Sequence, residues 1–158
     1  MTGAMEWISN FLYAAMLAGV PLLYGTLGEI LTEKAGNVNL GVEGMMYMGA
    51  VFGFMGAYYL DSAAAALLFA FLGGLGGALV YAFLTVTLKA NQNVAGLTLT
   101  IFGTGLANLL GTNMVNASGS GAAMVSDNIK AIFRPLDMGA LTALPYAGKL
   151  LFNHSILT

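Results

Sequence analysis

The charged residues of this chain are confined to a few clusters, and this distribution constrains its fold more than any other feature. Only 8% of the 158 residues are charged and 58% are apolar, whereas soluble domains carry about 25% charged residues. Between the clusters lie uncharged tracts at residues 7–28, 44–60, 62–88 and 90–126. A soluble domain of this size does not need so much apolar surface, so the pattern predicts membrane-spanning segments.

The lengths of these tracts predict the number of spans. A helix rises about 1.5 Å per residue and the hydrocarbon core is about 30 Å thick, so roughly 20 apolar residues cross it. Two tracts are long enough, one is at the short limit, and the last holds one span before a polar remainder that begins near Thr112. We therefore predict an all-α, polytopic transmembrane helical bundle of about four spans, with three or five also compatible. The single expected domain, 1–158, has spans at about 7–28, 44–60, 62–88 and 94–110 and an extramembrane loop at about 112–153.

A polar segment with the sequence EILTEKAGNVNLGVE follows the first predicted span, at residues 29–43. Each charge at the bilayer centre would cost about 2.5 to 3.5 kcal/mol on insertion scales, so this segment cannot face lipid. It is either an aqueous loop or an interrupted helix buried in protein, and both interpretations stay open. A shorter polar entry, at residues 90–93, precedes the fourth predicted span.

Glycines recur at four-residue spacing in two of the predicted spans, as Gly49 with Gly53 and as Gly73 with Gly77. This spacing places each pair on one helix face. Small residues let helix backbones approach closely in a bilayer, where hydrophobicity cannot drive helices together. We therefore expect these four glycines to be helix-packing positions.

Residues for catalysis or metal binding are scarce. The chain has no cysteine, and its one histidine is His154, close to the C-terminus. We therefore predict a protein that is not an enzyme and that uses no metal or cofactor. The five Lys and Arg residues are scattered, which argues against binding to nucleic acid. Glu29 and Glu33, at i and i+4, could share a helix face and bind a cation or a proton.

Two stretches, LGEILTEKAGNVNLGVEGMMYMGA at residues 27–50 and NQNVAGLTLTIFGTGL at residues 91–106, resemble a known permease family. This family serves ATP-binding-cassette (ABC) importers for simple sugars and nucleosides and is related to the branched-chain amino acid permeases. Its pattern E-x-x-x-E-[KR]-x-G-x-x-N-L-G-[VI]-E-G is matched from Glu29 to Gly44. Residues 144–153 are similar to the external loop before the next span. The resemblance covers nearly the whole chain but only the N-terminal half of such a permease, so we expect a truncated form without the ATPase-docking loop.

The resemblance implies a multi-pass protein of the inner (plasma) membrane that forms part of a solute translocation path. It also implies a separate ATPase subunit, a second permease chain, an external solute-binding protein and a small-molecule solute that is a nucleoside or simple sugar. Polar groups at membrane depth must face protein or water. The candidate path residues are therefore Glu29, Glu33, Asn37, Asn39, Glu43, Asn91, Gln92 and Asn93.

Two other classes of protein remain open from the residues alone. One is a small membrane scaffold or accessory protein that does not transport, in which the polar segments are ordinary loops. The other is an ion-coupled secondary carrier, in which the glutamates bind a proton or cation. Co-purification of an ATPase would favour the importer, whereas uptake that an uncoupler abolishes without dependence on an ATPase would favour the carrier.

Cysteine-accessibility labelling tests the assignment of the third span. Leu72→Cys and Ala78→Cys should resist water-soluble thiol reagents, because both positions lie well inside the tract at residues 62–88. Ready modification of either cysteine in the membrane would remove this span from the assignment.

Overall fold

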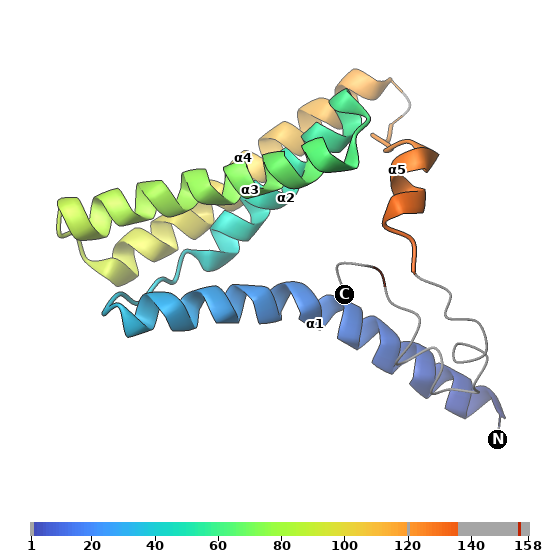
Figure 1. Ribbon diagram of the computed structural model, residues 1–158, viewed down its shortest axis with the longest axis horizontal. Coiled ribbons are helices and arrows are strands. Elements are labelled where there is room, and N and C mark those ends of the chain that lie inside the picture. The colour runs from blue at the N-terminus through green and yellow to red at the C-terminus, as the bar shows by residue number, and fades with distance from the viewer. Residues whose placement is uncertain (1, 120, 136–154, 156–158) are drawn as a thin grey trace. The chain divides into compact units, whose positions relative to one another are not determined.

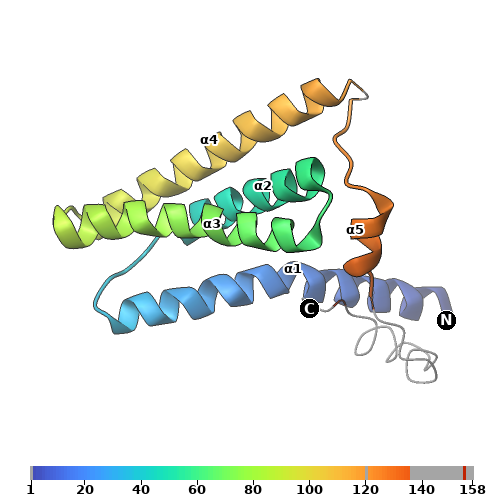
Figure 2. The same cartoon turned by 45° about the horizontal axis from the view of Figure 1, so that its top comes forward.

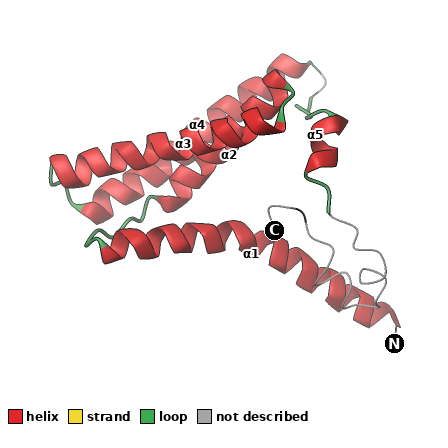
Figure 3. Cartoon of the chain, in the orientation of Figure 1, coloured by secondary structure: helices red, strands yellow, loops and turns green. Residues whose placement is uncertain are grey.

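All regular structure in the described part of the chain is helical, as the composition predicts (Figure 3). The computed structural model describes residues 2–119, 121–135 and 155. Its elements, labelled in Figure 1, are α1 (Thr2–Lys34), α2 (Val42–Leu60), α3 (Ala63–Ala82), the π-helical turn η1 (Phe83–Thr87), α4 (Gln92–Ser118) and α5 (Asp127–Ile132). The chain divides into two compact units, residues 1–24 with 130–158 and residues 25–129. The second unit contains α2, α3, η1, α4 and the end of α1.

Within the described residues, three stretches of helix are long and apolar enough to cross a membrane, namely Gly3–Lys34, Ala63–Thr87 and Gln92–Ser118. The second predicted span, at residues 44–60, corresponds to α2, whose 19 residues would extend about 28 Å at 1.5 Å per residue. It is not among these three stretches, and it contains Glu43, several glycines and several tyrosines. The all-α, multi-pass architecture agrees with the predicted bundle of about four spans.

The first and fourth helices are longer than the spans predicted for them. The first predicted span ends at Gly28, whereas α1 continues through the charged residues to Lys34. Glu and Lys are good helix formers, so a charge marks the limit of lipid contact without ending a helix. Pro21 also lies within the helix.

The loop predicted for 112–153 is wrong at its start, because residues 112–118 belong to α4. Their polar side chains do not stop a helix, and α4 ends where Gly119 adopts a left-handed conformation with φ of 65°. The short helix α5 lies within the remainder of this predicted loop. Residues 136–154, which include His154 and the predicted external loop at 144–153, lie outside the described residues.

Helices α2 and α3 form a hairpin whose contact is lined by glycine (Figures 1 and 2). A Cβ atom at Gly49 would lie 3.1 Å from the Ala70 carbonyl oxygen, and one at Gly53 would lie 2.9 Å from the Ala70 Cβ. On the facing helix, a Cβ at Gly73 would lie 2.9 Å from the Met48 carbonyl oxygen. A Cβ at Gly77 would meet Met45 and Met48 side chains, at 3.0 and 3.3 Å. Side chains larger than hydrogen would therefore separate the two helices.

Helix α4 packs on α2 through a second pair of glycines that face each other. A Cβ at Gly44 would lie 2.7 Å from the Thr100 Cα, and one at Gly103 would lie 2.7 Å from the Gly44 Cα. These contacts are between backbones, so neither neighbour can move aside as a flexible side chain could. Helices α2 and α4 therefore approach as closely as two backbones can.

Substitution of a contact glycine should cost more stability than substitution of a neighbouring open one. We expect Gly73→Ala to lower the stability of the detergent-solubilised protein, because the new Cβ would meet the Met48 backbone. Gly76→Ala is the matched control, since nothing lies within 4 Å of its Cβ position and alanine favours helix by about 0.5 to 1 kcal/mol. Thermal unfolding measures both. Equal or higher stability of Gly73→Ala relative to Gly76→Ala would contradict the tight α2–α3 contact.

Candidate functional site

The polar segment predicted between the first two spans is a short break between α1 and α2, at residues 35–41. Gly36 ends α1 with φ of 85°, a left-handed conformation that glycine adopts without strain. The Gly36 N–H donates to the Glu33 carbonyl over 2.9 Å, and the Asn37 N–H donates to the Thr32 carbonyl over 3.0 Å. These are the two hydrogen bonds of a Schellman motif. The interruption is therefore specified locally, by a glycine stop.

Side chains from three helices bind the backbone of this break. Glu29 Oε1 accepts the Asn39 N–H at 2.6 Å, and the Tyr81 hydroxyl donates to the Val38 carbonyl at 2.6 Å. The Thr100 hydroxyl donates to the Leu40 carbonyl at 2.9 Å. Non-helical backbone in a membrane protein needs such partners, because lipid offers none.

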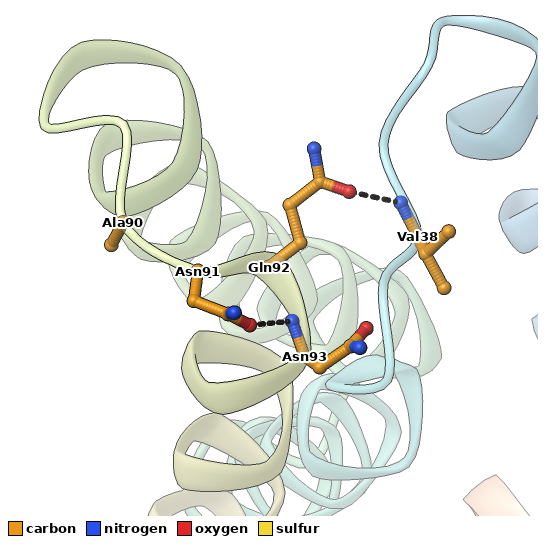
Figure 4. A pocket seen from close by; sticks show the side chains of 5 residues that line it. All are labelled: Val38, Ala90, Asn91, Gln92 and Asn93. Carbon is orange, nitrogen blue, oxygen red and sulfur yellow. Dashed lines mark hydrogen bonds between the residues drawn. The ribbon is translucent and has the colours of Figure 1, made fainter.

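Gln92, in the first turn of α4, contributes both ends of its amide to the break. Its Oε1 accepts the Val38 N–H at 2.8 Å, as Figure 4 shows. Its Nε2 donates to Asn37 Oδ1 at 3.0 Å and to the Gly36 carbonyl at 3.3 Å. A single side chain thus replaces the backbone partners that a continuous helix would have supplied.

Asn39 is the buried polar side chain of the break, with 6% of its surface exposed. Its Oδ1 accepts the Gly41 N–H at 2.9 Å, and its Nδ2 contacts the Met45 sulfur at 3.7 Å. The first of these bonds satisfies a backbone donor just before α2, where Gly41 itself offers no capping side chain. Asn39 therefore terminates the break at its α2 end.

The close approach of the break to α4 requires glycine on the helix. A Cβ at Gly96 would lie 2.8 Å from the Leu40 nitrogen and 2.9 Å from the Gly41 nitrogen. Gly96 is buried and lies one helical turn before Thr100, whose hydroxyl binds the Leu40 carbonyl. The same face of α4 thus combines room for the backbone with a hydrogen-bond donor.

Asn91 caps the N-terminus of α4. Its Oδ1 accepts the N–H of Asn93 at 3.0 Å, as Figure 4 shows, and the N–H of Val94 at 3.2 Å. Asparagine is among the best N-cap residues because its side chain satisfies these unpaired donors. The surface pocket here is lined by Val38, Ala90, Asn91, Gln92 and Asn93.

The turn that leads into this end of α4 is a π-helical segment. In η1 the Leu88 N–H donates to the Phe83 carbonyl over 3.1 Å, and the buried Thr85 hydroxyl donates to the Tyr81 carbonyl over 2.9 Å. Lys89 then adopts φ of 52°. Short π segments within helices occur frequently at functional sites.

The structure brings together four of the eight predicted path residues and leaves four apart. Glu29, Asn37, Asn39 and Gln92 meet at the break. The other four are Glu33 and Glu43, which are exposed, Asn91, which caps α4, and Asn93, which is exposed at the pocket.

Sequence reasoning did not identify Tyr81 and Thr100 as site residues. A phenol buried in an apolar span needs a hydrogen-bond partner, and this need is the signal that could have identified Tyr81.

The family model described as "Branched-chain amino acid transport system / permease component" matches residues 9–137. The chain belongs to this permease family. A protein of Haloferax volcanii named as a glucose ABC transporter permease is 35% identical, over 96% of this chain and 44% of its own length. The guanosine ABC transporter permease of Bacillus subtilis is 27% identical, over 98% of this chain and 48% of its own length. No solved structure matches the chain.

These matches confirm the resemblance carried by the motif from Glu29 to Gly44. This member of the permease family is a multi-pass inner-membrane protein. It spans about half the length of the curated relatives that it matches. The break and all of its side-chain partners fall within the matched residues.

Removal of the Gln92 amide should destabilise the permease more than removal of the neighbouring amide. Gln92→Met would leave the Val38 N–H and the Gly36 carbonyl without their partner. An unsatisfied buried group costs about 1 to 3 kcal/mol, and partial exposure here places the loss near the lower limit. Asn93→Met is the control, because Asn93 is exposed. Denaturant unfolding in detergent measures the difference. Equal stability of the two variants would contradict a stabilising role of the Gln92 amide at the break.

Proposed function

We propose that this chain forms part of the solute translocation path of an ABC importer for a nucleoside or simple sugar. Membership of the permease family supports a role in transport, and the names of the glucose and guanosine permeases support the solute class. ATP hydrolysis belongs to a separate ATPase subunit in this proposal. A second permease chain and an external solute-binding protein complete the importer, as the family implies.

The observation that carries the proposal is the non-helical break at residues 35–41, placed between helices of an apolar bundle and bonded throughout to side chains. Irregular backbone is tolerated at membrane depth only where protein buries it or where it lines a water-filled cavity. Many transporters build their solute sites from such interrupted helices. Five hydrogen bonds from Glu29, Tyr81, Gln92 and Thr100 hold this one.

The path residues proposed here divide into two roles. Asn37, Asn39, Glu29 and Gln92 shape the break by hydrogen bonding and helix termination. The amides of Asn91 and Asn93 and the carboxylates of Glu33 and Glu43 flank it, and offer donors and acceptors to a hydroxyl-rich solute.

The geometry disfavours the ion-coupled carrier. Glu29 Oε1 accepts the Asn39 N–H, and Glu29 Oε2 accepts the Thr32 hydroxyl at 3.1 Å. Both oxygens are therefore engaged within the protein, and the exposed Glu33 would have to bind an ion without them. The Glu29 carboxylate acts as a backbone acceptor in this arrangement.

Uptake assays test the proposal in a complete permease that contains this sequence. Asn39→Leu should abolish or strongly reduce uptake of radiolabelled nucleoside or sugar with little loss of expression, because the Gly41 N–H loses its acceptor. Asn108→Leu is the matched control, since Asn108 is exposed on α4 and lies outside the break. Normal uptake by Asn39→Leu would remove Asn39 from the path. Uptake that needs no ATPase and is abolished by an uncoupler would replace the importer with the carrier.

A further inference from the structure

Tyr81 is a buried polar side chain that the predicted path does not include. It lies near the end of α3 with 4% of its surface exposed, and its ring packs in a cluster with Ala95 and Leu99. Its hydroxyl donates to the Val38 carbonyl at 2.6 Å, across 43 positions of sequence. The ring alone would satisfy the apolar packing, so the hydroxyl calls for a separate explanation.

Val38 is held by its backbone and not by its side chain. The side chain is 41% exposed, so burial contributes little to its position. Its carbonyl accepts from Tyr81, before η1, and its N–H donates to Gln92, after η1. One residue of the break is thereby tied to the end of α3 and to the beginning of α4.

These bonds fix the peptide planes on both sides of Val38. The Val38–Asn39 peptide is bonded at both ends, with its carbonyl on Tyr81 and its N–H on Glu29. The Asn37–Val38 peptide is bonded through its N–H to Gln92. Each peptide plane is rigid, so the bonds on the Val38–Asn39 peptide restrict the backbone torsion that precedes the Asn39 Cα, and the bond on the Asn37–Val38 peptide restricts the torsion that follows the Asn37 Cα. Both restrictions limit the directions that the Asn37 and Asn39 side chains can take.

We propose that Tyr81 is a positioning residue, which acts through the Val38 carbonyl to orient Asn37 and Asn39 in the solute path. This inference rests on the proposed function for its consequence in transport. The hydroxyl has this role and the ring has the packing role, so the two can be separated by one substitution. Tyr81→Phe removes the hydroxyl and keeps the ring against Ala95 and Leu99.

Hydrogen exchange of the chain in lipid nanodiscs tests directly whether the Tyr81 hydroxyl stabilises the break. In Tyr81→Phe, the amides of Val38 and Asn39 should exchange roughly two- to tenfold faster, as expected for loss of one hydrogen bond. Peptides from α3 should exchange as in the wild type. Tyr47→Phe is the control, because Tyr47 is 53% exposed on α2. Unchanged exchange at residues 36–41 in Tyr81→Phe would overturn the proposal.

A double-mutant cycle in the complete permease tests whether Tyr81 affects transport through the asparagine side chains. Tyr81→Phe should lower the maximal uptake rate several-fold relative to Tyr47→Phe at equal abundance in the membrane. Combined with Asn37→Ala, its loss should be smaller than the product of the two single losses, because both changes act on one element. Normal uptake by Tyr81→Phe, or losses that multiply, would overturn the positioning role. If the wild-type permease takes up neither solute class, the proposed function fails, and the exchange experiment still decides whether Tyr81 holds the break.

Discussion

The hydrogen bonds to the backbone at residues 35–41 are the interaction on which the rest of this unit depends. A helix satisfies its own peptide groups, and an interrupted helix in an apolar bundle transfers that requirement to side chains. Glu29, Tyr81, Gln92 and Thr100 meet it here from three helices. Each of these helices must therefore pass close to the break, and this requirement decides where α3 and α4 lie relative to α2.

Glycine allows these helices to approach one another closely. The glycine contacts differ in how far the neighbouring atoms can rearrange. Between α2 and α3, Gly77 faces methionine side chains that can adjust, whereas Gly73 faces the Met48 backbone. Between α2 and α4, Gly44 and Gly103 face each other's backbone. The contact with α4 is the more rigid one, because two backbones at this separation have no side chain to rearrange. The break therefore packs against α4, the helix whose contact with α2 can rearrange least.

The sequence predicted the place of the break better than its partners. Charges at residues 29–43 had to avoid lipid, so electrostatics predicted a polar segment there, either an aqueous loop or a buried interruption. The Schellman motif at Gly36 sets the position at which the break begins. Charge alone could not show that α1 continues to Lys34. In the sequence, Tyr81 is apolar enough to belong to a membrane span. Its hydroxyl could lie at the membrane–water interface or bind a partner within the protein. Only the fold, which brings position 81 to position 38, distinguishes these possibilities.

The partners of the break also define what the remainder of an importer must supply. Among the described residues, these partners come from residues 29–100, within one compact unit. These partners bind the N–H and the carbonyl of Val38, the N–H of Asn39 and the carbonyl of Leu40. In the proposed importer, a hydroxyl-rich solute would therefore not bind these four bonded groups and would meet the flanking side-chain amides and carboxylates. Selectivity between a nucleoside and a sugar would then depend on those side chains together with the opposite wall of the path.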